Sequence, residues 1–243
     1  MIFDAEYFVF NPPLEVSFAR RVLVKPKARY ALPHPVTTSR ETLAAVIEGI
    51  RRVSDADIIF LEGSPDGGPM GPIYAGLGYE FPRVNRLDVR DCTLVEVENP
   101  LSRPFALPTF WVPNVVLSCD FLISVAPFQV IEGSGSFAIE NMLGLIPAAK
   151  YRAAGSDMTA VLQRLGLHNV IADFYFTLPF DLGIVDGRRR LVSGSSPTKG
   201  EADDYGKIFI GDPYEVDSEA SRAAVVETEY LRLIGSALTG PHI

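Results

Sequence analysis

A strand–helix–strand pattern near the start of the chain constrains the fold most strongly. Residues 20–26, RRVLVKP, form an apolar β-branched run that ends at a proline, and residues 58–61, IIFL, form a second apolar run. Between them, TSRETLAAVIEGIRR has apolar residues at helical spacing, with Thr38 and Glu41 placed as a capping box. Apolar strands joined through a helix are typical of a parallel sheet that is buried on both faces.

Further patterns extend this α/β reading along the chain. Strands are predicted at 93–98, 121–125, 182–185 and 207–210, and helices at 157–165, 168–176 and 218–238. We expect one α/β domain over residues 1–243, with a mainly parallel sheet, helices on both faces and an irregular proline-rich middle segment.

Three segments are predicted as breaks in regular structure. Residues 99–118 contain four prolines and indicate irregular or edge structure. The apolar run that begins at Phe121 is expected to end near Pro127, and the small residues 133–136 to form a soft loop before a short helix-like segment. The charged stretch 199–206 is predicted as a surface turn.

Composition and charge argue against several classes of function. The net charge of −8 argues against a nucleic-acid partner held by phosphate contacts. No apolar run reaches the length of about 18 residues that a membrane span needs. The chain begins without a basic segment typical of a signal peptide. Its two cysteines, Cys92 and Cys119, are too few to hold an iron–sulfur cluster within the chain. We therefore expect a cytoplasmic protein with a small-molecule ligand.

Polar residues follow the ends of the predicted strands, where open α/β sheets bind their ligands. The first strand leads to Lys25 and Lys27, and the second to Glu62 and Ser64. The later strands lead to the remaining two candidates, Asp186 and Asp212. If all these strands are parallel, one edge of the sheet collects lysines and carboxylates. The alternative for the lysines is a solvated strand end, and for the two aspartates a plain turn before Gly187 and Pro213.

Seven fragments in order resemble an uncharacterised family, domain of unknown function three hundred and sixty-two. They are VLVKPK at 22–27, EGSPDGG at 62–68, CDFLISVAPFQ at 119–129, ENMLGLIP at 140–147, GIVDG at 183–187, GSSPTKG at 194–200 and GDPYEVD at 211–217. Many relatives carry an added ferredoxin-type module, which this chain lacks. The resemblance implies a stand-alone domain and names no substrate.

The chain departs from the family pattern at several basic positions. Lys27 replaces an asparagine of the relatives, Glu140 replaces a lysine, and Phe128 and Gln129 lie in a run where relatives carry lysines and a histidine. Asn141 and Asp186 keep the pattern. The resemblance therefore implies an anion site that is altered in this chain.

The leading hypothesis is an enzyme that acts on a small, anionic and partly apolar metabolite at the carboxyl edge of the sheet. The anion would contact Lys25, Lys27, Ser64, Gln129 and Asn141, with Phe128 as an apolar wall, and Glu62 or Asp186 would move a proton. One alternative is a divalent-metal enzyme in which Glu62, Asp186 and Asp212 hold Mg²⁺. Another is a non-catalytic binding subunit with a decayed site. The cofactor stays unknown, and a protein partner or a second copy of the chain is compatible with every reading.

Overall fold

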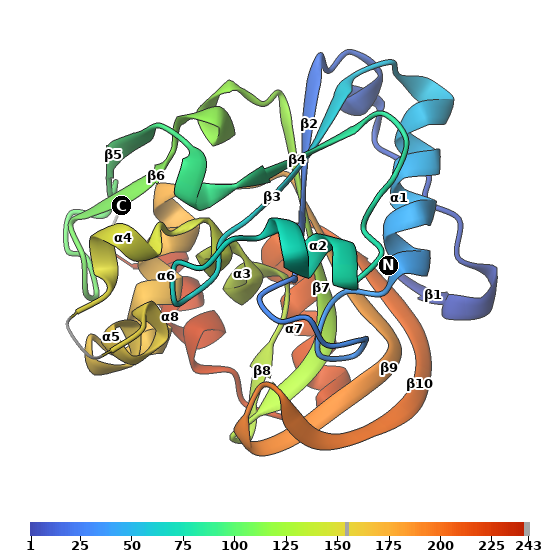
Figure 1. Cartoon of the computed structure of the whole chain (residues 1–243). Helices are drawn as coiled ribbons and strands as arrows, with labels where there is room; N and C mark the ends of the chain where they lie inside the picture. The colour runs from blue at the N-terminus through green and yellow to red at the C-terminus, as the bar shows by residue number, and fades with distance from the viewer. Residues whose placement is uncertain (154–155, 241–243) are drawn as a thin grey trace.

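An eight-stranded, mostly parallel sheet forms the centre of the protein (Figure 1). The computed structural model describes residues 1–153 and 156–240. Within these residues, the strand order is β1-β10-β9-β7-β2-β3-β4, and β8 pairs with β7. The strands of this sheet are β1 (Ile2–Asp4), β2 (Arg21–Pro26), β3 (Asp57–Glu62), β4 (Val84–Asp88), β7 (Phe121–Ile131), β8 (Ser134–Ser136), β9 (Leu182–Ser196) and β10 (Lys199–Gly211). A small separate sheet pairs β5 (Leu94–Glu98) with β6 (Thr109–Pro113).

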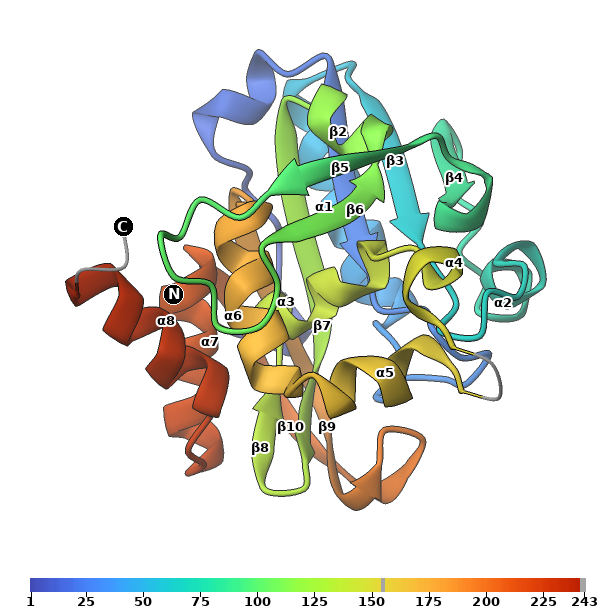
Figure 2. The same ribbon diagram turned by 90° about the vertical axis from the view of Figure 1, so that its left-hand side faces the viewer.

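Helices cover both faces of the sheet, as the apolar strands predict (Figure 2). The α-helices are α1 (Arg40–Val53), α2 (Gly71–Gly76), α3 (Ala138–Asn141), α4 (Ala148–Tyr151), α5 (Met158–Arg164), α6 (Leu167–Thr177), α7 (Pro213–Ala224) and α8 (Glu229–Thr239). The 3₁₀ turns are η1 (Ala5–Tyr7), η2 (Leu14–Ser17), η3 (Val89–Asp91), η4 (Asn114–Ser118) and η5 (Met142–Leu145). Helix α1 packs on one face, and α3, α6, α7 and α8 pack on the other. The α/β class with helices on both faces is confirmed.

The five strands β9, β7, β2, β3 and β4 run parallel, so their carboxyl ends meet at one edge. In the register, Pro26 lies beside Val125 and Asp186 lies beside Pro127. Glu62 ends β3 and pairs with the last residue of β4. This carboxyl edge is therefore the place where Lys25, Glu62 and Asp186 come to lie.

Strand β7 does not end at Pro127, so the expected break there is wrong. The strand continues to Ile131, with a register shift against β9 between Pro127 and Phe128. Because the ladder with β2 has already ended at Val125, the missing N–H of the proline falls at an irregularity that tolerates it. The expected soft loop is a hairpin: Glu132 and Gly133, both with positive φ, join β7 to β8.

The charged stretch 199–206 is strand, not a surface turn. It is the first part of β10, which pairs with β9 as a long antiparallel hairpin. Arg190 of β9 forms an ion pair of 2.9 Å with Asp203 of β10, so the charges face each other across the two strands. Residues 199–204 are exposed and carry no buried apolar side chains. The pattern of apolar residues from which strands are predicted is therefore missing here.

Two helices replace the single one predicted at 218–238. Helix α7 ends at Ala224, and Val225 adopts a left-handed conformation with φ of 58°. Helix α8 then turns back, and the hydroxyl group of Tyr230 donates to the buried Asp217 of α7. The start of α1 also differs in detail, because the side chain of Ser39, not Thr38, caps it by accepting from the Thr42 N–H. The Thr38 hydroxyl instead donates to the carbonyl of Val125.

Candidate functional site

Lys25 and Glu62 form a fully buried ion pair at the carboxyl edge. The Lys25 Nζ donates to Glu62 Oε2 at 2.7 Å, to the Pro26 carbonyl at 2.9 Å and to Asn141 Oδ1 at 3.2 Å. Both charged side chains have no exposed surface. Burial lowers the pKa of Lys25 to about 8, while the charge of Glu62 acts in the opposite direction. The solvated strand end considered for Lys25 is therefore wrong.

The α3–η5 segment closes over this pair without leaving space for a side chain. Asn141 Nδ2 donates to the Lys25 carbonyl and to Ser124 Oγ, each at 3.0 Å, so the amide is fixed at both ends. A Cβ atom added to Gly144 would lie 1.9 Å from Glu62 Oε1 and 2.6 Å from Lys25 Nζ. The glycine of the ENMLGLIP fragment is thus required by the close approach of η5 to the ion pair.

Lys27 is also buried, but its ammonium group contacts only neutral oxygens. The Nζ donates to Gln129 Oε1 at 2.7 Å and to Ser136 Oγ at 2.8 Å. Gln129 is itself held by the carbonyls of Pro35 and Val36. Burial lowers the pKa of Lys27 to about 8, against the opposing charges of Glu140 and Glu62. The solvated alternative is wrong for this lysine too, since only 4% of its surface is exposed.

Two polar groups, one in the loop after β2 and one on β8, have buried atoms without a partner among the described residues. They are the Nε and Nη2 atoms of Arg29 and the hydroxyl group of Ser134. Arg29 lies close enough to lower the pKa of both Lys25 and Lys27. Ser134 stands two residues before Ser136 on β8, so both face the side of the hairpin that Gln129 occupies. Unpaired buried groups of this kind call for a bound water, ion or ligand.

The charges of this cluster do not cancel. Lys25, Lys27 and Arg29 are three cationic groups, while Glu62 and Glu140 are the carboxylates that act on Lys27. While Lys27 is an ammonium group, one positive charge of these side chains is not matched by a carboxylate, and an uncompensated charge in a largely buried cluster is costly. A small anion placed against Arg29 and Lys27 would remove this imbalance.

Asp186 lies at the same edge but contacts the other face of the sheet. Its carboxylate accepts from the Ser39 N–H at 3.1 Å, the Ser39 hydroxyl at 2.5 Å and the Arg188 N–H at 3.2 Å. It thereby anchors the N-terminus of α1. Beside it, His34, Ser39, Tyr79, Arg188 and Arg189 are among the residues that line a cavity of about 470 Å³.

Ser64 belongs to a loop of its own. Its hydroxyl donates to Asp66, and its carbonyl accepts from the Gly67 N–H at 3.0 Å. The loop lines a small cavity of about 110 Å³ together with Asp88, Arg152 and other residues. The structure thus places Ser64 at the carboxyl edge and pairs it with Asp66.

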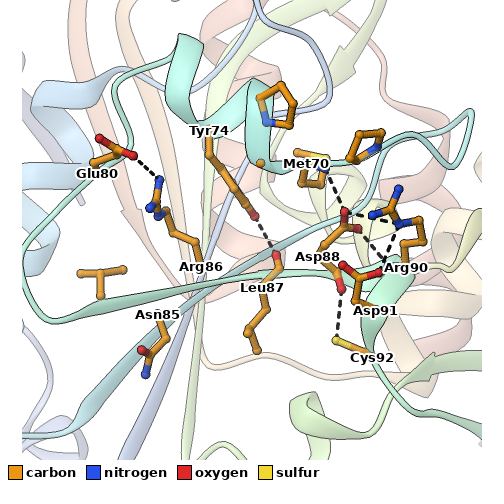
Figure 3. A pocket seen from close by; sticks show the side chains of 14 residues that line it. Met70, Tyr74, Glu80, Asn85, Arg86, Leu87, Asp88, Arg90, Asp91 and Cys92 are labelled. Atoms are coloured by element: carbon orange, nitrogen blue, oxygen red, sulfur yellow. Dashed lines mark hydrogen bonds and ion pairs between the residues drawn. The ribbon is translucent and has the colours of Figure 1, made fainter.

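The largest of the cavities described here, about 620 Å³, lies beside the edge strand β4 (Figure 3). Asp88 accepts from the N–H groups of Met70 at 2.8 Å and Arg90 at 2.9 Å, and Tyr74 donates to the carbonyl of Leu87. Of the charged groups drawn there, Glu80 pairs with Arg86, and Arg90 pairs with Asp88 and Asp91. Sequence reasoning missed this cavity because β4, VNRLD, has too few apolar residues to be predicted as a strand.

Two predicted site residues are not with the others. Asp212 follows β10, which is antiparallel to β9, so it lies at the opposite end of the sheet and caps α7 through the N–H groups of Tyr214 and Glu215. A metal site that joins it to Glu62 and Asp186 is therefore wrong. Phe128 packs in the core on the rings of Phe137, Tyr205 and Phe209. It does not form the apolar wall predicted for the anion site around Lys25 and Lys27. Over residues 1–153 and 156–240, no group of three or more His, Cys, Asp or Glu side chains is arranged to hold a metal ion.

Comparison with models of protein families gives a match over most of the chain. A family model described as "Domain of unknown function (DUF362)" matches residues 22–222. The matched range includes β3, β7, β9, the α3–η5 segment and β2 except for its first residue, and it therefore contains Lys25, Lys27 and Arg29. A search of curated proteins found no match. Among the described residues, no helix has the length and apolar character to cross a membrane.

Proposed function

The chain belongs to the DUF362 family, and from that premise we propose that it is an enzyme that binds a small organic anion at the carboxyl edge of its sheet. The contacts proposed for the anion are Arg29 and Lys27. The observation that carries this proposal is the guanidinium group of Arg29, which has two buried nitrogen atoms without a partner among the described residues.

The chemistry of these two side chains favours a carboxylate or a phosphate group. A guanidinium group offers parallel N–H donors that match two oxygens of either anion, and a lysine adds a third donor and a second charge. An anion would satisfy Arg29, and it would balance the excess of one cation in the cluster. Both residues follow the end of β2, two positions apart, in the loop that leads to α1.

The proposal gives the two lysines different tasks. Lys25 donates hydrogen bonds to Glu62 and Asn141, and we assign it the task of holding the carboxyl edge in place. Lys27 has neutral partners and a pKa of about 8, so it exchanges a proton near neutral pH. A group that titrates near the working pH is suited to acid–base chemistry. Glu62 and Asp186, the predicted proton carriers, are each held by other groups of the protein, and Lys27 is the better candidate.

Anion binding is tested with the Arg29→Gln variant. Isothermal titration of the wild-type protein with pyruvate, phosphate and citrate identifies which of these anions bind. Losing a charge-assisted contact of about 1.5–3 kcal/mol weakens the Kd of that anion about ten- to hundredfold in the variant. The control is Arg103→Gln, since Arg103 is exposed on the loop between β5 and β6.

Two results would contradict the proposal. The first is that none of the anions bind wild-type protein. The second is an equal Kd for Arg29→Gln and Arg103→Gln. Binding without any chemical turnover would favour the alternative of a non-catalytic binding subunit.

A further inference from the structure

Lys25 and Lys27 differ in the number and kind of their hydrogen-bond acceptors. An ammonium group has three N–H donors, and a neutral amine has two N–H donors and one lone pair. Lys25 contacts three acceptors, one of them a carboxylate, which matches an ammonium group. Lys27 contacts two acceptors, both neutral, which match the two N–H bonds of an amine. The amine lone pair of Lys27 then points in the remaining tetrahedral direction.

The groups around Lys27 make this neutral form accessible near pH 8, whereas the ammonium form predominates at lower pH. Burial acts most strongly and lowers its pKa, and the positive charge of Arg29 acts in the same direction. The negative charges of Glu140 and Glu62 oppose them, and the balance leaves a pKa of about 8. A lysine in a desolvated site next to another cation is activated as a nucleophile.

We propose that Lys27 is a nucleophile that condenses with the carbonyl group of a 2-oxo acid to form a Schiff base, while Arg29 holds the carboxylate of that acid. This inference rests on the proposed anion site and names its substrate class. A 2-oxo acid carries a carboxylate directly next to an electrophilic carbonyl carbon. One small molecule of this class can therefore pair with the guanidinium group of Arg29 and react with the amine of Lys27.

The steps balance without a cofactor. The lone pair of the Lys27 Nζ attacks the carbonyl carbon, and the π electrons of the C=O bond move to its oxygen, which takes up the proton that the nitrogen loses. The carbinolamine oxygen then takes a proton from solvent and leaves as water, while the nitrogen lone pair forms the C=N bond that gives an iminium group on Lys27. The Ser134 hydroxyl, buried and without a partner among the described residues, is a donor for the carbinolamine oxygen. The resulting iminium group accepts electrons from the neighbouring carbon, which supports enamine chemistry.

The test is reductive trapping on the wild-type protein. The protein is incubated with pyruvate or phenylpyruvate at a pH near the pKa of Lys27, reduced with sodium cyanoborohydride, and analysed by intact mass and peptide mapping. One adduct is expected, with the added mass of the oxo acid less one oxygen atom, on Lys27. Exposed Lys199 and Lys207 are internal controls for unspecific reaction, and lactate, which has no carbonyl at that carbon, is the ligand control.

Variants separate the roles of the two residues. Lys27→Met is expected to give no adduct. Arg29→Gln is expected to give the same adduct at a pyruvate concentration that is about tenfold higher or more, because the contact to the carboxylate is lost.

The outcomes distinguish this inference from the proposed anion site. Calorimetric binding of pyruvate without an adduct on Lys27 overturns the Schiff base and leaves the anion site standing. Equal adducts on Lys27 and the exposed lysines also overturn it. If pyruvate, phenylpyruvate, phosphate and citrate all fail to bind and no adduct forms, both proposals fail.

Discussion

The two buried lysines at the end of β2 are held by different partners, and this difference sets what each residue can do. Lys25 is held by a carboxylate and two further oxygens, so its charge is matched within the protein. Lys27 is held by an amide oxygen and a hydroxyl group, and Arg29 nearby adds a further positive charge. Both lysines are buried, but only Lys25 contacts a carboxylate directly, and this difference underlies the separate roles that we propose for them.

Lys25→Met is expected to destabilise the protein by about 3–5 kcal/mol, because it leaves the buried charge of Glu62 without its partner. Urea denaturation measures this difference. The double variant Lys25→Met/Glu62→Gln removes both charges and is expected to recover more than half of the loss. The control Lys207→Met breaks an exposed ion pair with Asp4 and is expected to cost less than about 1 kcal/mol. A loss for Lys25→Met as small as that of the control would contradict the structural role.

At the scale of elements, the α3–η5 segment determines how the cluster is enclosed. It places Asn141 against Lys25 and brings the backbone at Gly144 within contact of the ion pair. Strand β8 adds Ser136, which completes the neutral partners of Lys27. The hairpin of β7 and β8 and the helical turn after it therefore act together as the wall of the site.

Gly144→Ala is expected to destabilise the protein by about 1–3 kcal/mol or more, since the added methyl group overlaps Glu62 and Lys25 in a closed site. Gly194→Ala is the matched control, because a Cβ atom there has no neighbour within 4 Å and the residue lies in β9. Thermal and urea unfolding of the two variants give the comparison. Equal stability of both would show that η5 moves away from the ion pair at little cost.

In the molecule as a whole, the main sheet separates two hydrophobic cores, one on each face, and its carboxyl edge carries buried polar side chains. Helix α1 and the N-terminal segment close one face, and α3, α6, α7 and α8 close the other. Of the buried charged side chains in the described residues, Lys25, Lys27, Glu62 and Asp186 lie at the carboxyl edge, while Asp173 and Asp217 are buried on α6 and α7. The stability of the whole fold therefore depends on the protonation of a few buried groups.

The free energy of unfolding is expected to rise with pH between about 8 and 10. Lys25 and Lys27 have a folded-state pKa of about 8, below the ordinary value of 10.5, so in this range the unfolded chain binds more protons than the folded one. Each lysine contributes a slope of at most about 1.4 kcal/mol per pH unit. Above pH 10 the trend reverses, because burial raises the pKa of Tyr74 and Tyr230 and only the unfolded chain ionises there.

Urea unfolding of wild-type protein and Lys27→Met over this pH range measures the effect. The slope between pH 8 and 10 is expected to be smaller in Lys27→Met, since one of the two titrating lysines is gone. Lys207→Met, on the exposed side of β10, is expected to keep the wild-type slope. Identical slopes in all three proteins would contradict a lowered pKa for Lys27.

The amino-acid sequence is enough to predict the α/β class, the positions of the central apolar strands along the chain and the edge of the sheet at which Lys25, Lys27, Glu62 and Asp186 lie. Apolar runs and a helical stripe carry this information because burial depends on local spacing. The alternation of Lys25, Lys27 and Arg29 along five residues was also a readable signal, although the candidate set did not include Arg29.

Which of these groups contact one another depends on the three-dimensional arrangement of the strands. Glu62 pairs with Lys25 whereas Asp186 anchors α1, because the two carboxylates leave their strands toward different partners. Asp212 lies at the far end because β10 is antiparallel to its neighbour β9. Strand direction, register and the path of β7 past Pro127 depend on pairing between residues far apart in the chain, and local spacing does not encode that pairing.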